Sequence, residues 1–136
     1  MKRLLLIGAT LVIFFSCSPS DDGPDFNLEI LPIESVDIPD EFEIGETYPI
    51  TVSYLRPSTC HFFRNFYYAR ENNERTVAVI TNVLLDNDCE DLENDLVEST
   101  FNFIVTSNGS YIFKFWQGED TNGEDQYLTI EVPVIE

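Results

Sequence analysis

Two clusters of acidic and amide side chains are the residues in this sequence best suited to chemistry. Calcium takes about six to eight oxygen ligands, and alternating Asp and Asn positions in a loop can supply them. The sequence therefore offers two loops as candidate weak calcium sites, although solvated acidic loops that bind no metal are the interpretation that we favour. The first cluster comprises Asp86, Asp88, Glu90 and Asp91, and the second comprises Asp120, Asn122, Glu124 and Asp125.

Catalytic residues of the hydrolytic kind have little support. Such chemistry requires a poised base beside a nucleophile, and the one histidine, His61, follows a cysteine that we expect in a disulfide. The sequence contains no GxSxG, HExxH or glycine-rich phosphate-binding motif. We therefore predict that the protein is not an enzyme and has no cofactor, with calcium as the one candidate exception. His61 is expected to pack, or to bind backbone, at the start of a strand.

Aromatic side chains are the other candidates for ligand contact. Trp116 precedes the polar segment 117–125, on the strand face opposite the apolar residues of its strand, and Tyr127 follows that segment. Rings with a polar edge suit contacts with protein or glycan partners. We predict Trp116 and Tyr127 as contact residues, with Tyr67 and Tyr68 nearby. Core packing is the alternative, and we expect it for most of these rings.

The elements that position these residues are predicted to be short strands. Alternation of apolar and polar residues, β-branched and aromatic richness, and turn signals between the segments are typical of an all-β sandwich of about seven strands. No segment shows a sustained helical period. The strands are predicted at residues 26–38 (one or two edge segments), 48–54, 61–70, 76–85, 100–106, 111–115 and 128–134.

One segment carries a resemblance to a known fold. Residues 107–113 (SNGSYIF) resemble the tyrosine corner of immunoglobulin-like domains, with Tyr111 as the corner residue. Residues 38–54 resemble the opening strands of bacterial immunoglobulin-like modules. The resemblance implies an immunoglobulin-like antiparallel β-sandwich over residues 27–136. A plain hairpin turn within the corner segment is the alternative, and it would leave the flanking strands in one sheet.

The amino-terminal segment predicts a location. A basic start precedes a short apolar run, residues 4–15, whereas a membrane-spanning helix needs about 20 residues. Residues 14–17 (FFSC) resemble the lipobox of bacterial lipoproteins. That resemblance implies a signal peptide over residues 1–16 and lipid attachment at Cys17, which gives stable membrane anchoring. An uncleaved membrane anchor is the alternative.

The segment after Cys17 predicts a tether. Residues 18–25 are polar and acidic and contain Pro and Gly, which favours a flexible tether over residues 17–26, with the lipidated Cys17 at its start. Their acidic stretch resembles the export signal of surface lipoproteins in the Bacteroidetes group. The whole chain is thus similar to a Bacteroidetes-type surface lipoprotein with a single immunoglobulin-like module. That resemblance implies a fold and lipid anchoring to the outer membrane with surface exposure, but no activity.

The remaining cysteines, Cys60 and Cys89, form an even pair. The predicted compartment is oxidising, so we predict a disulfide between them. Two free thiols, or a metal site, are the alternatives. A metal site would need more ligands, and the chain has one histidine and no CxxC motif.

The charge of the chain limits its partners. The 25 acidic residues against 7 basic ones give a net charge of −18, which repels nucleic-acid phosphates and anionic lipid headgroups. A requirement for solubility is sufficient to explain such a surface. The more specific interpretation is that the surface binds a divalent cation or a basic partner. We predict a non-catalytic cell-envelope lipoprotein that acts as a surface binding or adhesion module for a protein or glycan. A structural or accessory subunit of an outer-membrane protein complex is the alternative.

Overall fold

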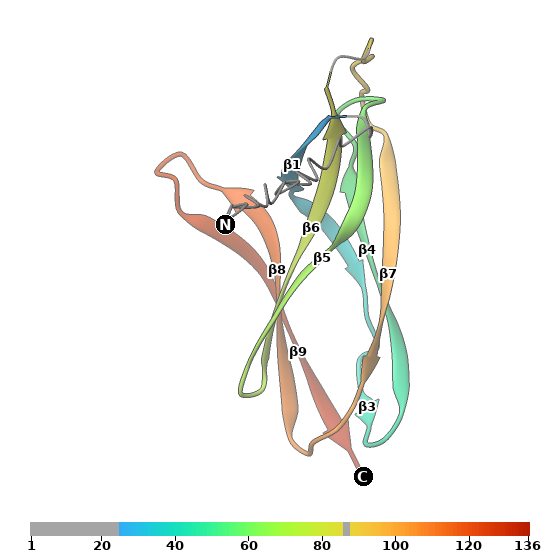
Figure 1. Ribbon diagram of the computed structural model, residues 1–136. Coiled ribbons are helices and arrows are strands. Elements are labelled where there is room, and N and C mark those ends of the chain that lie inside the picture. The colour runs from blue at the N-terminus through green and yellow to red at the C-terminus, as the bar shows by residue number, and fades with distance from the viewer. Residues whose placement is uncertain (1–24, 86–87) are drawn as a thin grey trace, which may run out of the picture.

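The structure is a computed structural model that describes residues 25–85 and 88–136. Its strands form two sheets that enclose a common core, which confirms the all-β class and the sandwich (Figure 1). Within the described residues, no helix has the length and hydrophobicity that a membrane crossing requires. The strands are β1 (Phe26–Leu31), β2 (Ile33–Asp37), β3 (Phe42–Glu43), β4 (Thr47–Leu55), β5 (His61–Glu71), β6 (Glu74–Leu84), β7 (Leu96–Ile104), β8 (Ser110–Glu119) and β9 (Asp125–Ile135).

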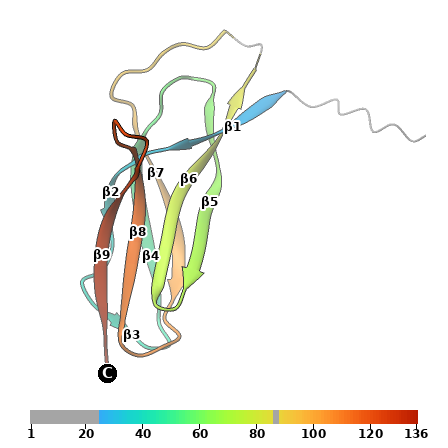
Figure 2. The ribbon, with the colours of Figure 1, turned by 90° about the vertical axis from the view of Figure 1, so that its left-hand side faces the viewer.

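The larger sheet is arranged around β6. Strand β5 pairs antiparallel along one edge of β6, while β1 and β8 share the other edge (Figure 2). There, β1 is antiparallel to residues 79–84 and β8 is parallel to residues 74–77. Strands β9 and β3 complete this sheet, and the smaller sheet has the order β2-β4-β7. In the described chain, β5 and β7 each pair with one strand and therefore each leave a free edge.

The structure corrects the predicted strand count and pairing. The described residues form nine strands rather than about seven. Pro32, which has no N–H to donate to a ladder, divides residues 26–38 into β1 in the larger sheet and β2 in the smaller one. Strand β3 has two residues, too few for an alternation pattern. The β3–β9 and β6–β8 pairings are parallel, so the sandwich is not purely antiparallel.

The core lies between the two sheets and consists of alternate strand residues. Successive side chains of a strand point to opposite faces, so every second residue can be buried. Fully burying one such side chain contributes about 1.5–3 kcal/mol. The most deeply buried apolar side chains include Phe42, Ile50, Val52, Val77, Val79, Phe113, Phe115 and Val132.

Tyr111 ties the connection between the sheets to the core. Strand β7 lies in the smaller sheet and β8 in the larger one, so the plain-hairpin alternative is wrong. The Tyr111 hydroxyl accepts the backbone N–H groups of Thr106 (3.2 Å) and Ser107 (3.1 Å) and lies 2.8 Å from the Ser107 hydroxyl. Burial alone raises the pKa of Tyr111, but these hydrogen bonds outweigh it and lower the pKa below 10.0. A tyrosine corner makes this kind of contact with upstream backbone.

Candidate functional site

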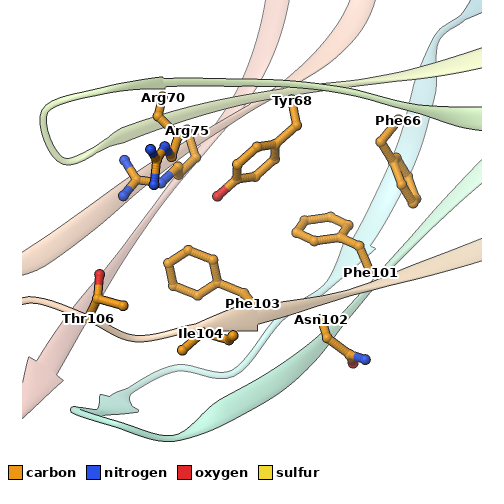
Figure 3. A pocket seen from close by; sticks show the side chains of 9 residues that line it. All are labelled: Phe66, Tyr68, Arg70, Arg75, Phe101, Asn102, Phe103, Ile104 and Thr106. Atoms are coloured by element: carbon orange, nitrogen blue, oxygen red, sulfur yellow. The ribbon is translucent and has the colours of Figure 1, made fainter.

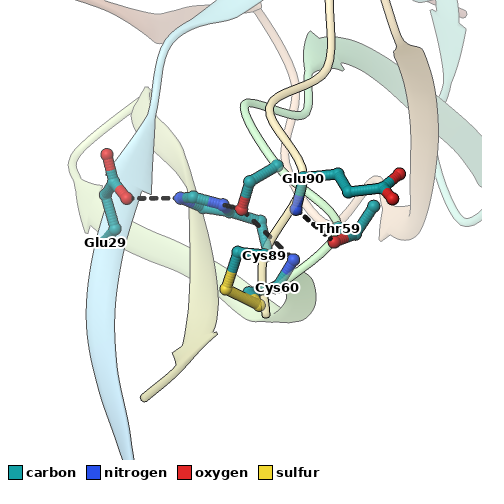
Figure 4. The surroundings of a disulfide bond; sticks show 7 residues. Glu29, Thr59, Cys60, Cys89 and Glu90 are labelled. Carbon is teal, nitrogen blue, oxygen red and sulfur yellow. Dashed lines mark hydrogen bonds and ion pairs between the residues drawn. A yellow bond between two sulfur atoms is a disulfide. The ribbon is translucent and has the colours of Figure 1, made fainter. Parts of the chain in front are cut away.

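His61 is buried at the first residue of β5, where it bonds to two side chains. Its Nε2 atom lies 2.6 Å from a carboxylate oxygen of Glu29, and its Nδ1 atom lies 2.7 Å from the Ser58 hydroxyl. The Ser58 oxygen also accepts the backbone N–H of Cys60, and Figure 4 shows Cys60 joined to Cys89 on one side of this network and Glu29 on the other. The position at a strand start agrees with the prediction, but the bonding partners of the ring are side chains rather than backbone.

A serine, a histidine and a carboxylate in a row invite comparison with a hydrolase triad. Such a site needs a nucleophile that a substrate can reach, and both Ser58 and His61 are 7% exposed. Neither residue lines the cavity beside Trp116 or the cavity beside Tyr68. We therefore assign this network to holding β1 against the start of β5. Glu29 could not be identified from the sequence, because it is 32 residues from His61 and reaches it only through strand pairing.

The predicted Cys60–Cys89 disulfide is present, with a Cα–Cα distance of 5.5 Å. It fastens the connection between β6 and β7 to the segment before β5. Backbone bonds extend this attachment: the Thr59 N–H donates to the carbonyl of Glu90, and the Leu92 N–H donates to the carbonyl of Pro57. The first acidic cluster is therefore part of a tied connection. Asp88, Glu90 and Asp91 are exposed there, and Asp86 lies outside the described residues.

The second acidic cluster forms the tip of the β8–β9 hairpin. One carboxylate oxygen of Asp120 accepts the backbone N–H groups of Asn122 (2.8 Å) and Glu124 (3.0 Å). The carboxylate of Asp125 accepts the indole N–H of Trp116 (3.0 Å). In the part of the chain that the structure describes, no three His, Cys, Asp or Glu side chains form a group that could hold a metal. Calcium binding stays a prediction.

The two predicted contact residues, Trp116 and Tyr127, are brought together on the outer face of the larger sheet. They are cross-strand neighbours on β8 and β9, and Tyr67 of β5 joins them across β6. The three rings line a surface cavity of about 320 Å³. The other residues that line this outer cavity are Ile30, Thr76, Ala78, Glu119 and Asp125.

The expectation of core packing is wrong for three tyrosines, Tyr67, Tyr68 and Tyr127. Tyr67 is 49% exposed, Tyr68 41% and Tyr127 40%. Tyr67 and Tyr68 are consecutive residues of a strand, so they point to opposite faces of the sheet. Tyr68 consequently lines a different cavity from Tyr67. Aromatic content alone did not reveal which rings would face solvent.

The outer cavity is acidic. Glu119 and Asp125 are its charged residues, and no lysine, arginine or histidine lines it. The bond from Trp116 fixes the Asp125 carboxylate at the edge of the indole. Aromatic faces carry partial negative charge as well. Rings and carboxylates together favour a cationic group with an apolar stem.

An apolar strip adjoins the outer cavity. Phe26, Leu28 and Ile30 alternate along β1, so they share one face, and they are 46%, 58% and 47% exposed. Phe62 is 47% exposed and lies on β5, opposite the Asn82 position that also pairs with Leu28. Ile30 belongs to both the strip and the cavity wall. Exposed apolar residues that adjoin in this way are typical of an interaction surface.

No protein-family model, no curated protein and no solved structure matches this chain. The function proposed below therefore depends on the geometry and charge of the chain's own residues.

Proposed function

We propose that this chain is a non-catalytic binding module of the cell envelope that holds a basic protein partner on the outer face of its larger sheet. One observation carries the proposal: Trp116, Tyr127 and Tyr67 line a single surface cavity together with the carboxylates of Glu119 and Asp125. A lysine or arginine side chain of the partner would occupy it, with the aliphatic stem against the rings.

The energetics favour such an occupant. A cation over an aromatic face gains about 0.5–1 kcal/mol at an exposed site, and more where it is desolvated. The net charge of −18 attracts a basic surface from a distance and repels an acidic one. The apolar strip on β1 supplies contact area beside the charged cavity. Together these features give a partner class, a basic protein surface with an apolar flank.

The same proposal includes a location and a fold relationship. We infer a signal peptide over residues 1–16 and a lipid on Cys17, both outside the described residues, with the domain displayed at the cell surface. We also infer descent from immunoglobulin-like modules. The contacts of the Tyr111 hydroxyl with upstream backbone support that inference. The parallel β6–β8 pairing is a departure from the immunoglobulin-like strand order.

Trp116 is the only tryptophan of the chain, so its fluorescence reports directly on the outer cavity. The probe is the peptide acetyl-Gly-Lys-Gly-amide, and its uncharged match carries norleucine in place of lysine. We expect the lysine peptide to change the emission with a Kd of about 1 mM, and the norleucine peptide to bind at least about five-fold more weakly. Equal binding of the two peptides would contradict the proposal. Binding of maltohexaose but of neither peptide would indicate a glycan platform instead.

A charge-neutral variant tests the role of the carboxylate. Asp125→Asn keeps an acceptor for the Trp116 indole but removes the charge. We expect it to weaken the lysine peptide by about 3- to 10-fold. Tyr68→Ala is the matched control, because Tyr68 lies on the opposite face of β5 and should leave the affinity unchanged. A loss of equal size in both variants would point to a general change in the domain.

A specific observation favours the second candidate, an accessory subunit of an outer-membrane protein complex. The exposed apolar strip of Phe26, Leu28 and Ile30 begins at the last residue of the predicted tether, so it is close in sequence to the predicted lipid attachment. Two measurements separate the candidates. Digestion of the domain by protease on intact cells supports surface display. Protection there, with co-elution of a membrane protein that Leu28→Glu abolishes, supports the accessory subunit.

A further inference from the structure

A second cavity opens between the free edges of β5 and β7, on the inner side of the sandwich. Its volume is about 510 Å³, and side chains from both sheets line it (Figure 3). Rings from the two strands meet at its back: the Phe66 and Phe101 centroids lie 5.1 Å apart, and those of Tyr68 and Phe101 lie 6.0 Å apart. We call it the inner cavity, lined chiefly by Phe66, Tyr68, Arg70, Arg75, Phe101 and Phe103.

Two arginines lie side by side at one end of the inner cavity. Arg70 and Arg75 are cross-strand partners in the β5–β6 hairpin, so their side chains leave the sheet on the same face. Figure 3 shows their guanidinium groups next to one another, with the Tyr68 hydroxyl directed toward them. Like charges directly opposite each other on a sheet repel and destabilise the pair. A negative group between the two guanidinium groups would relieve this repulsion.

Arg75 is held in place by its surroundings. It is 7% exposed, and its guanidinium carbon lies 5.1 Å from the ring centroid of Tyr111. One terminal nitrogen donates to the carbonyls of Asn72 (2.9 Å) and Glu74 (2.8 Å). Its buried Nε has no hydrogen-bond partner among the described residues. A fixed guanidinium of this kind loses little conformational entropy when it binds an anion.

The described residues provide no carboxylate for this arginine pair. Arg56 and Lys114 each pair with one, at 2.8 Å and 3.3 Å, and His61 lies 2.6 Å from another. Neither Arg70 nor Arg75 forms an ion pair within the described ranges. In a chain with 25 acidic residues and 7 basic ones, an arginine pair without a carboxylate is the reverse of what composition alone would give. A carboxylate from outside the described residues would complete it.

Tyr68 adds a neutral donor. Burial raises the pKa of Tyr68 above 10.0, while the positive charges of Arg75 and Arg70 oppose the rise. The phenol therefore keeps its proton at neutral pH and can donate to an anion between the two arginines.

We propose that the inner cavity binds a small organic monoanion: a carboxylate attached to an aromatic or branched apolar body. The carboxylate accepts hydrogen bonds from Arg70, Arg75 and Tyr68, since guanidinium groups match its planar geometry. The apolar body lies against Phe66 and Phe101, where a phosphate or sulfate would gain nothing. A single charge also suffers least from the net charge of −18. This site is separate from the outer cavity and independent of the function proposed for it.

The test uses the full-length protein in a non-ionic detergent at low salt, with isothermal titration calorimetry. The probes are 3-phenylpropionate, its neutral amide 3-phenylpropionamide, and inorganic phosphate. We expect 3-phenylpropionate to bind with a Kd below about 1 mM, and the amide and phosphate to bind at least about 10-fold more weakly. Equal binding of acid and amide, phosphate binding as tight as the acid, or no binding of the acid at about 10 mM would each overturn the proposal.

A matched pair of variants locates the site. Arg70 and Arg64 are both exposed arginines of β5, but only Arg70 lines the inner cavity. Arg70→Gln should lower the affinity for 3-phenylpropionate about 10-fold. Arg64→Gln, which makes the same change in net charge, should lower that affinity less than about two-fold. Circular dichroism checks that both variants fold. Equal losses in the two variants would overturn the assignment, and an unchanged affinity in Trp116→Ala separates this site from the outer cavity.

Discussion

The outer and inner cavities both have aromatic walls, yet their charges are opposite. Glu119 and Asp125 line the outer cavity, and Arg70 and Arg75 line the inner one. Adjacent residues of a single strand contribute to both, because Tyr67 faces one cavity and its neighbour the other. Rings supply apolar area to a ligand of either sign. Under the two proposals, the charged side chains, rather than the aromatic residues, therefore select the class of ligand.

The two cavities also differ in their relation to the folded core. Trp116 lies on the outer face of the sheet, bonded to an exposed hairpin tip. Arg75 is buried over the ring of Tyr111, which also ties the two sheets together. The outer cavity can therefore be altered at little cost in stability. The inner cavity shares its residues with the core, so changes there affect both binding and folding.

Removal of the disulfide should lower the stability of the domain without abolishing binding at either cavity. In the double variant Cys60→Ser/Cys89→Ser, we expect the free energy of unfolding to fall by about 3.5 kcal/mol, because the bond closes a loop with a separation of 29 residues. Urea denaturation measures the loss. Both probes should still bind under native conditions, because neither cysteine lines a cavity. A loss of either binding activity would show that the disulfide positions that cavity.

The second prediction tests the link between the inner cavity and the core. Arg75→Ala removes the hydrogen bonds to the carbonyls of the β5–β6 turn and the packing over Tyr111. We expect a loss of about 2–4 kcal/mol in the free energy of unfolding, measured in urea. Trp116→Ala, at the outer cavity, should cost less than about 1 kcal/mol. Similar losses of stability in the two variants would show that the inner cavity is no more closely linked to the core than the outer one.

The third prediction uses ionic strength. The net charge of −18 attracts the lysine peptide and repels 3-phenylpropionate, and salt screens both effects. Between about 20 and 500 mM NaCl, we expect the affinity for the lysine peptide to fall by about 3- to 10-fold. The affinity for 3-phenylpropionate should change less than about two-fold, because weaker repulsion offsets weaker attraction. Equal decreases in a calorimetric titration would contradict the opposite signs of the two cavities.

The smallest expected effects come from the adjacent tyrosines of β5. Tyr68→Phe removes one donor and should weaken 3-phenylpropionate by about 3- to 5-fold without changing the lysine peptide. Tyr67→Ala should weaken the lysine peptide by a similar factor without changing 3-phenylpropionate. Crossed effects, in which either substitution changes the other probe, would show that the two cavities are coupled through the strand.

Local pattern accounted for much of the fold. Alternation over residues 48–54 and 111–115 identified β4 and β8, because a strand with one buried face repeats every two residues. Strand β3 was missed, since two residues have no period. The pairing of the two arginines could have been predicted from the sequence, because a two-residue turn at Asn72-Asn73 sets Arg70 opposite Arg75. In the structure, Asn72 has the positive φ, 54°, that such turns require.

The all-β class, the cysteine pair and the strand face that carries Trp116 could be predicted from the sequence, because each follows from period, composition or count. Three features became visible only in the folded structure: β1 and β8 share one edge of β6, Glu29 reaches His61, and the free edges of β5 and β7 border a cavity. These features join residues distant in the chain. Their pairing depends on the packing of whole sheets, which no local pattern of side chains encodes.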